Sequence, residues 1–152
     1  MKNSTQNLET LRREKRLLLK EKERRLGLND LYFFNKEILD CEDFIEGLHG
    51  ELCEFVSNRE GKRKKLILMP RGSFKSTAVT IGMSLWEAVK NPNIRILISS
   101  EKHTNSAKFL GAIKGICESN KKFKESCIPV PSLLWVSHLF PLKCFPLKNH
   151  LF

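Results

Sequence analysis

The sequence predicts an α/β fold, in which a parallel β-sheet forms the core and a set of helices precedes it. Two short apolar runs, LILM at 66–69 and IRILISS at 94–100, have the form of buried strands. A segment with helical periodicity follows each of them, at 76–90 and at 104–120. Strand, helix, strand and helix joined by short connections are typical of a parallel sheet.

The N-terminal region, residues 1–58, is expected to be helical. Residues 8–27 are strong helix formers, with Ser4 or Thr5 as a cap and Gly27 as a stop. Their thin leucine stripe fits a solvated surface helix, or else a basic arm that touches DNA or a neighbouring subunit. Residues 41–58 carry apolar side chains at helical spacing and an acidic outer face. His49 lies beside that stripe, and we interpret it as an ordinary helix residue.

The net charge of +10 is unevenly distributed along the chain. Residues 1–27 carry nine Lys/Arg against four Asp/Glu, and residues 28–58 carry one against eight. Residues 59–75 carry seven against one, and residues 76–152 carry ten against four. A basic balance suits nucleic acid or nucleotide phosphates as a partner, although a well-solvated surface would explain it equally well.

The five cysteines form neither a CxxC pair nor a Cys/His cluster with metal spacing. Their odd number, together with a charged N-terminus unlike a secretory leader, predicts free thiols in a reducing cytoplasm. No apolar run reaches the roughly 20 residues that a membrane-spanning helix needs, so no membrane association is expected.

The stretch LILMPRGSFKST, residues 66–77, has the parts of a phosphate-binding loop in the right order. Backbone N–H groups at a helix N-terminus, a lysine and a hydroxyl are what a nucleotide polyphosphate and its Mg²⁺ require. We expect Lys75 to be the cation and Ser76 the magnesium ligand. Met69 and Phe74 occupy the two positions where the strict GxxxxGK[ST] pattern has glycine. A basic turn after an edge strand is the alternative.

Arg71 is not needed merely to hold phosphate, because it precedes the loop lysine by four residues. It could sense or stabilise the γ-phosphate, as an arginine finger does within one chain. The candidate catalytic residues are therefore Arg71 and Lys75.

The loop MPRGSFKST, followed by ILISSEKHTNSAKFLGAIKGICESNKKF, resembles the ATPase domain of the large terminase subunit of tailed bacteriophages. The upstream LHGELCEFV is similar to a helix that precedes the ATPase core in that family. The resemblance covers residues 42–125. It implies a P-loop NTPase core of the ASCE or RecA-like type, with ATP and Mg²⁺ as cofactors. It also implies that the phosphates are framed by Pro70, Arg71, Gly72, Ser73, Phe74, Lys75, Ser76 and Thr77.

The same resemblance implies a motor that drives viral DNA into the procapsid of a phage, in the cytoplasm of the bacterial host. Its partners would be double-stranded DNA, the portal protein and the small terminase subunit, and oligomers would form only in the full-length motor. The family also needs a Walker B aspartate, a catalytic glutamate and a nuclease domain. Residues 78–152 contain no aspartate, so we expect this chain at most to bind nucleotide.

The chain is therefore expected to comprise a helical region at 1–58, a partial ATPase core at 59–125 and an atypical tail at 126–152. The tail is apolar and broken by four prolines, as an out-of-frame sequence would be, although an apolar tail that packs on the sheet is the alternative. Two other functions remain open: a small nucleotide-binding module without turnover, and another P-loop ATPase such as a helicase-like protein.

Overall fold

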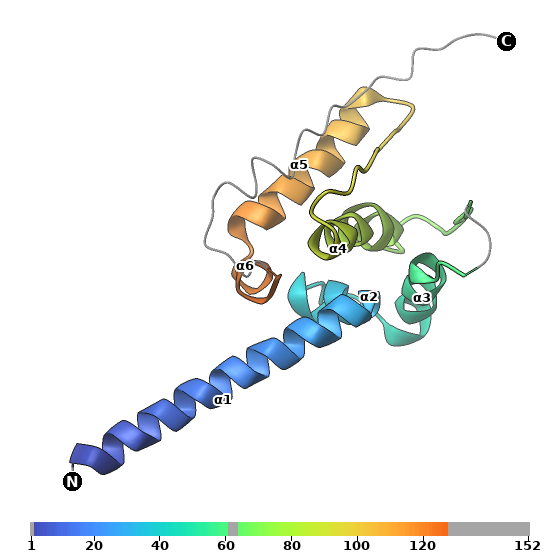
Figure 1. Ribbon diagram of the computed structural model, residues 1–152. Coiled ribbons are helices and arrows are strands. Elements are labelled where there is room, and N and C mark those ends of the chain that lie inside the picture. Colours follow the sequence, from blue (N-terminus) through green and yellow to red (C-terminus); the bar gives the residue numbers. More distant parts are fainter. Residues whose placement is uncertain (1, 61–63, 128–152) are drawn as a thin grey trace, which may run out of the picture.

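A long helix, α1 (Lys2–Asn29), projects away from the other helices over most of its length (Figure 1). The computed structural model describes residues 2–60 and 64–127. The predicted helix is confirmed, and Leu8, Leu11 and Leu18 are 51–72% exposed, as expected both for a solvated surface helix and for a basic arm. Gly27, however, does not end it. The helix continues to Asn29, and Gly27 is buried where a Cβ atom would lie 2.2 Å from Ile38 Cδ1.

Short helical turns follow α1 and pack against its C-terminal end. Asp30 caps α2 (Leu31–Phe33) by accepting the N–H of Tyr32 at 2.8 Å, and α2 runs into the π-helical turn η1 (Phe34–Ile38). The chain then turns at Asp40, whose φ is 63°. A second π-helical turn, η2 (Glu46–Gly50), continues into α3 (Glu51–Ser57). The helix expected within 41–58 is therefore confirmed for residues 46–57.

The two downstream helices also match their predicted ranges. A third π-helical turn, η3 (Ser76–Gly82), continues into α4 (Met83–Lys90), so residues 76–90 are helical throughout. Helix α5 (His103–Ser119) begins one residue before the predicted segment and ends one residue before its end. A short helix, α6 (Lys121–Cys127), follows it.

The predicted α/β fold with a parallel-sheet P-loop core is wrong. The described residues are 70% helical, contain no β-strand and form an all-α arrangement. Segments 64–70 and 94–100 are extended, and their side chains alternate as in strands: Ile67 and Met69 are half-buried, whereas Leu66 and Leu68 are 79% and 83% exposed. Within the described residues, neither segment forms a backbone ladder with a neighbour. A short apolar run specifies an extended backbone with one buried face, but pairing depends on a second strand brought alongside.

One hydrophobic core joins the N-terminal helical turns to α4, α5 and α6. Phe34 is fully buried and meets the ring of Phe123 edge to face, with the ring centroids 6.2 Å apart. Trp86 of α4 donates its indole N–H to the carbonyl oxygen of Gly27 at 2.8 Å. The core thus includes residues from both predicted regions, 1–58 and 59–125, and that division stays a prediction.

In the part of the chain described, no helix is both long enough and apolar enough to cross a membrane. The predicted tail at 126–152 lies, apart from its first two residues, outside the described residues.

Candidate phosphate-binding loop

The loop at 70–75 connects the extended segment 64–69 to the N-terminus of η3, and its backbone alternates in handedness. Gly72 has φ 81° and Phe74 has φ 49°, whereas Lys75 has φ −54° and Ser73 is not among the residues with positive φ. In such an alternation, successive backbone N–H groups turn toward a common point and form an anion-binding concavity. The 15-residue helical stretch that follows directs its positive dipole end at the same place.

Phe74 adopts the left-handed conformation that the strict pattern assigns to glycine. For a residue with a side chain this conformation costs about 1–2 kcal/mol, so something in the surroundings must hold it. Two rings, those of Phe44 and His49, contact Phe74 there, and we call Phe44, His49 and Phe74 the aromatic cluster. The His49 ring stacks on Phe44 at 4.5 Å between centroids, and Phe74 lies 6.1 Å from His49 and 6.3 Å from Phe44.

Lys75 folds back over the loop that precedes it. Its Nζ donates to the carbonyl oxygen of Met69 at 3.0 Å, so the ammonium group spans the turn from one side to the other. The hydroxyl of Ser73 donates to the carbonyl oxygen of Pro70 at 2.9 Å and tightens the turn. The ammonium group of Lys75 therefore lies beside Met69, where the chain enters the turn.

The other predicted residues lie along the same turn. Ser76 and Thr77 are half-buried in the first turn of η3, while Arg71 and Gly72 are exposed at the bend. This arrangement leaves Arg71 at the solvent side of the loop. The sequence prediction thus identifies a contiguous set of residues, and the structure places all of them on one turn and the helix that follows.

His49 contacts the loop at Ser73, and the sequence did not predict this contact. Its side chain is 2% exposed, and Nδ1 lies 2.8 Å from the backbone nitrogen of Ile45, whose N–H it can accept, and 3.2 Å from the carbonyl oxygen of the same residue. A neutral imidazole with Nδ1 as acceptor carries its proton on Nε2, which lies 3.3 Å from the carbonyl oxygen of Ser73. The only signal in the sequence was the position of His49 beside an apolar stripe, which is compatible with many roles.

Two further contacts anchor the segment that enters the loop. Lys65 Nζ donates to the carbonyl oxygens of Phe55 at 2.5 Å, Val56 at 3.0 Å and Asn58, and so caps the C-terminus of α3. Arg59 pairs with Glu87, a side chain of α4 that is mostly buried. Both residues precede the loop, so the segment that enters it is fixed to α3 through Lys65 and to α4 through Arg59.

Mg²⁺ would find few protein ligands at this loop. Within the described residues, no group of three His, Cys, Asp or Glu side chains could hold a metal ion. Mg²⁺ bound through phosphates needs only one or two protein oxygens and keeps several waters, so the Ser76 hydroxyl at the start of η3 fits that role.

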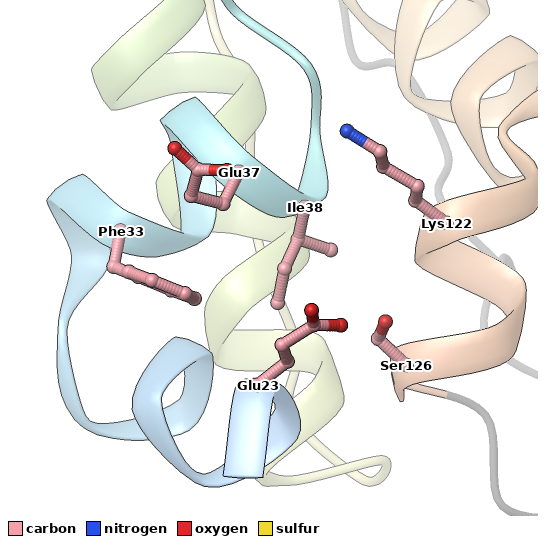
Figure 2. Close-up of a pocket in the computed structure, with 6 residues that line it drawn as sticks. All are labelled: Glu23, Phe33, Glu37, Ile38, Lys122 and Ser126. Carbon is pink, nitrogen blue, oxygen red and sulfur yellow. The ribbon is translucent and has the colours of Figure 1, made fainter. Parts of the chain in front are cut away.

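Two cavities lie apart from the turn. One, of about 100 Å³, lies between α1, η1 and α6 and is lined by Glu23, Phe33, Glu37, Ile38, Lys122 and Ser126 (Figure 2). In Figure 2 the Glu23 side chain comes from α1 and the Ser126 side chain from α6, and Lys122 pairs with Asp40 at 2.9 Å. The other, of about 390 Å³, adjoins the segment that enters the loop and is lined by Phe55, Asn58, Glu60, Lys64, Lys65 and Leu66. Neither cavity contains a residue of the 70–77 stretch.

Comparisons with protein-family models, with curated proteins and with solved structures find no match to this chain.

Proposed function

We propose that the loop at 70–77 binds the polyphosphate of a nucleotide such as ATP, together with Mg²⁺. The observation that carries this proposal is the alternating backbone of Gly72, Ser73, Phe74 and Lys75 at the N-terminus of a helix. Such a turn supplies several N–H donors to one anion without any side-chain rearrangement. The proposal depends on the turn and its helix alone, and it does not require a β-sheet.

Each side chain of the loop has a role in this proposal. Lys75 exchanges the Met69 carbonyl for an outer phosphate oxygen, a better partner because it is fully charged. Ser76 contributes its hydroxyl to Mg²⁺, which neutralises phosphate charge when bound. Arg71 is exposed at the bend, where a long side chain can reach the terminal phosphate. Pro70, Gly72, Ser73, Phe74 and Thr77 frame the site.

The similarity of this segment to phage terminase large subunits supports ATP as the nucleotide. In that context we propose that the segment belongs to a machinery that packages double-stranded DNA in the cytoplasm of a bacterial host. The portal protein and the small terminase subunit would then be partners of the whole assembly.

For the chain itself we propose nucleotide binding without turnover. Hydrolysis in such ATPases needs an aspartate to support Mg²⁺ and a glutamate to orient water. Residues 78–152 contain no aspartate, and Glu101, which follows the second extended segment, is exposed. These observations favour a binding module over an enzyme.

Titration of the full chain with Mg-ATP by calorimetry tests the proposal, with Lys75→Ala as the informative variant. We expect saturable binding by the wild type and loss of binding in Lys75→Ala. The matched control is Lys108→Ala, which removes the same charge from an exposed position on α5 and should bind as the wild type does. Equal affinities in all three proteins would refute the proposal.

A further inference from the structure

We infer that His49 is a positioning residue of the phosphate-binding loop, an inference that rests on the proposed function. Its Nε2–H donates to the carbonyl oxygen of Ser73, which belongs to the same peptide unit as the N–H of Phe74. A trans peptide unit is planar, and its C=O and N–H point in opposite directions. Holding the carbonyl toward η2 therefore directs the Phe74 N–H the other way, as an anion-binding turn requires.

The His49 ring can do this because it is fixed at both nitrogens and on its face. Nδ1 lies 2.8 Å from the Ile45 nitrogen and 3.2 Å from the Ile45 carbonyl oxygen, and the shorter contact, to the N–H donor, favours Nδ1 as the acceptor and the proton on Nε2. Phe44 covers the face of the ring, with only 11° between the two planes. A ring with both its tautomer and its orientation fixed is a more effective support than a rotating hydroxyl or amide.

The contact also links the loop to the acidic helical region that precedes it. Ile45 directly precedes η2 and His49 lies in its last turn, and Ser73 lies 24 residues beyond His49 along the chain. If the orientation of the 73–74 peptide affects phosphate affinity, bound phosphate must stabilise the His49 contact to the same extent. Nucleotide binding would then stabilise η2 and α3 as well as the loop.

Two substitutions separate the two hydrogen bonds of the ring. In His49→Gln, the side-chain N–H₂ can reach the position of Nε2 and still donate to the Ser73 carbonyl. In His49→Asn, the shorter amide can occupy the position of Nδ1 and accept from Ile45, but it cannot reach Ser73. Both variants lose the ring stacking on Phe44, so both should be less stable than the wild type by a similar amount. Their affinities for Mg-ATP should differ, because only His49→Gln keeps the hydrogen bond to Ser73.

The experiment compares Mg-ATP affinity in the wild type, His49→Gln and His49→Asn, with thermal unfolding measured in parallel. Loss of a hydrogen bond to the loop predicts about tenfold weaker binding in His49→Asn, with His49→Gln within about threefold of the wild type. Equal affinity in the two variants, with the wild type still binding, would overturn the role of His49 and leave the proposed function intact. Absence of binding by the wild type would instead remove the proposed function.

Long-range ¹H–¹⁵N correlation of the His49 imidazole provides a second measurement that needs neither a variant nor a ligand. The inference requires the proton on Nε2 in the wild-type protein. A proton on Nδ1 would overturn it, whatever the outcome of the nucleotide titration. If ATP binds, adding it should shift the His49 ring signals in the wild type and leave them unchanged in Lys75→Ala.

Discussion

Trp86 donates its indole N–H to the carbonyl oxygen of Gly27, 59 positions earlier in the chain, at 2.8 Å. This bond joins α4, the helix that continues from the loop, to the end of α1. Gly27 also allows the close approach of Ile38, because a Cβ atom there would lie 2.2 Å from the Ile38 side chain. The Lys90 ammonium group lies over the indole ring, 3.2 Å from the ring centroid. The position of α4, and with it the start of the loop helix, thus depends on a contact with α1.

Trp86→Phe should destabilise the native state, because the Gly27 carbonyl loses its donor and the smaller ring leaves a void. We expect a loss of about 1–3 kcal/mol in the free energy of unfolding, measured by urea denaturation. Lys90→Ala is the control, since it removes the cation above the ring and keeps the hydrogen bond. Its expected cost is about 0.5–1 kcal/mol. A smaller loss in Trp86→Phe than in Lys90→Ala would contradict this account.

Gly82→Ala should also be destabilising, although alanine is the better helix former. A Cβ atom at Gly82 would lie 1.8 Å from Oδ1 of Asn35, a fully buried side chain whose Nδ2 contacts Cys53 Sγ at 3.7 Å. The buried Asn35 side chain cannot move into solvent, so η1, which carries Asn35, and η3, which carries Gly82, must move apart. We expect this to lower the free energy of unfolding by about 1–3 kcal/mol.

The matched control for Gly82→Ala is Gly111→Ala on α5. Gly111 is exposed, and a Cβ atom there would meet nothing within 4 Å. Helix propensity alone predicts that this variant is more stable than the wild type by about 0.5–1 kcal/mol. Thermal unfolding of both variants gives the comparison, and shifts of the same sign would show that the contact with Asn35 does not matter.

The helices could be predicted from the sequence because their signal is local. Residues 76–90 and 104–120 repeat apolar side chains at helical spacing, and the structure reproduces both ranges to within a residue. Gly27 was misread because a glycine that allows close packing looks, in sequence, like a glycine that ends a helix. Only the position of Ile38 distinguishes the two cases.

The lack of a sheet in the described residues and the contact of His49 with the loop could not be predicted for a different reason, since both depend on residues distant in the chain. Runs such as LILM specify an extended backbone, but nothing in them supplies a paired strand. The loop residues from Pro70 to Thr77 are contiguous, so the sequence could identify them as a set. His49 lies 24 residues from Ser73, and only the packing of η2 against the loop brings it there.

The stability of the protein should fall as the pH rises above about 9, because two buried thiols resist ionisation. Burial raises the pKa of Cys53 and of Cys117 from the ordinary value of 9.0 to about 11. The folded state therefore keeps both protons over a range in which the unfolded chain loses them. This contribution is fully present below pH 9 and is lost as the pH rises toward 11, at roughly 1.4 kcal/mol per pH unit for each thiol.

Urea denaturation between pH 8 and pH 11 measures this loss. The double variant Cys53→Ala/Cys117→Ala is the control, because it removes both thiols and leaves the other groups that titrate in this range. Its free energy of unfolding should decline less steeply with pH than that of the wild type. Parallel curves would show that the two thiols do not titrate differently in the folded and unfolded states.

The left-handed conformation of Phe74 predicts which residues the loop can accept at that position. Glycine and asparagine adopt positive φ readily, whereas a β-branched side chain does so only with strain. Removing the Phe74 ring gives up its contacts with Phe44 and His49, but the ring is 42% exposed, and glycine no longer needs those contacts to hold a positive φ. We therefore expect Phe74→Gly and Phe74→Asn to bind Mg-ATP within about threefold of the wild type.

Phe74→Val is the informative comparison with Phe74→Asn, because the two side chains are similar in size and differ in their tolerance of this conformation. Valine would move the 73–74 peptide out of the turn, remove its N–H from the anion site and release the Ser73 carbonyl from His49. A penalty of about 1–2 kcal/mol for positive φ corresponds to about 5- to 30-fold weaker binding, which the same calorimetric titration resolves. Binding by Phe74→Val that matched Phe74→Asn would mean that phosphate does not depend on the alternating backbone, and the strongest support for the proposed function would be lost.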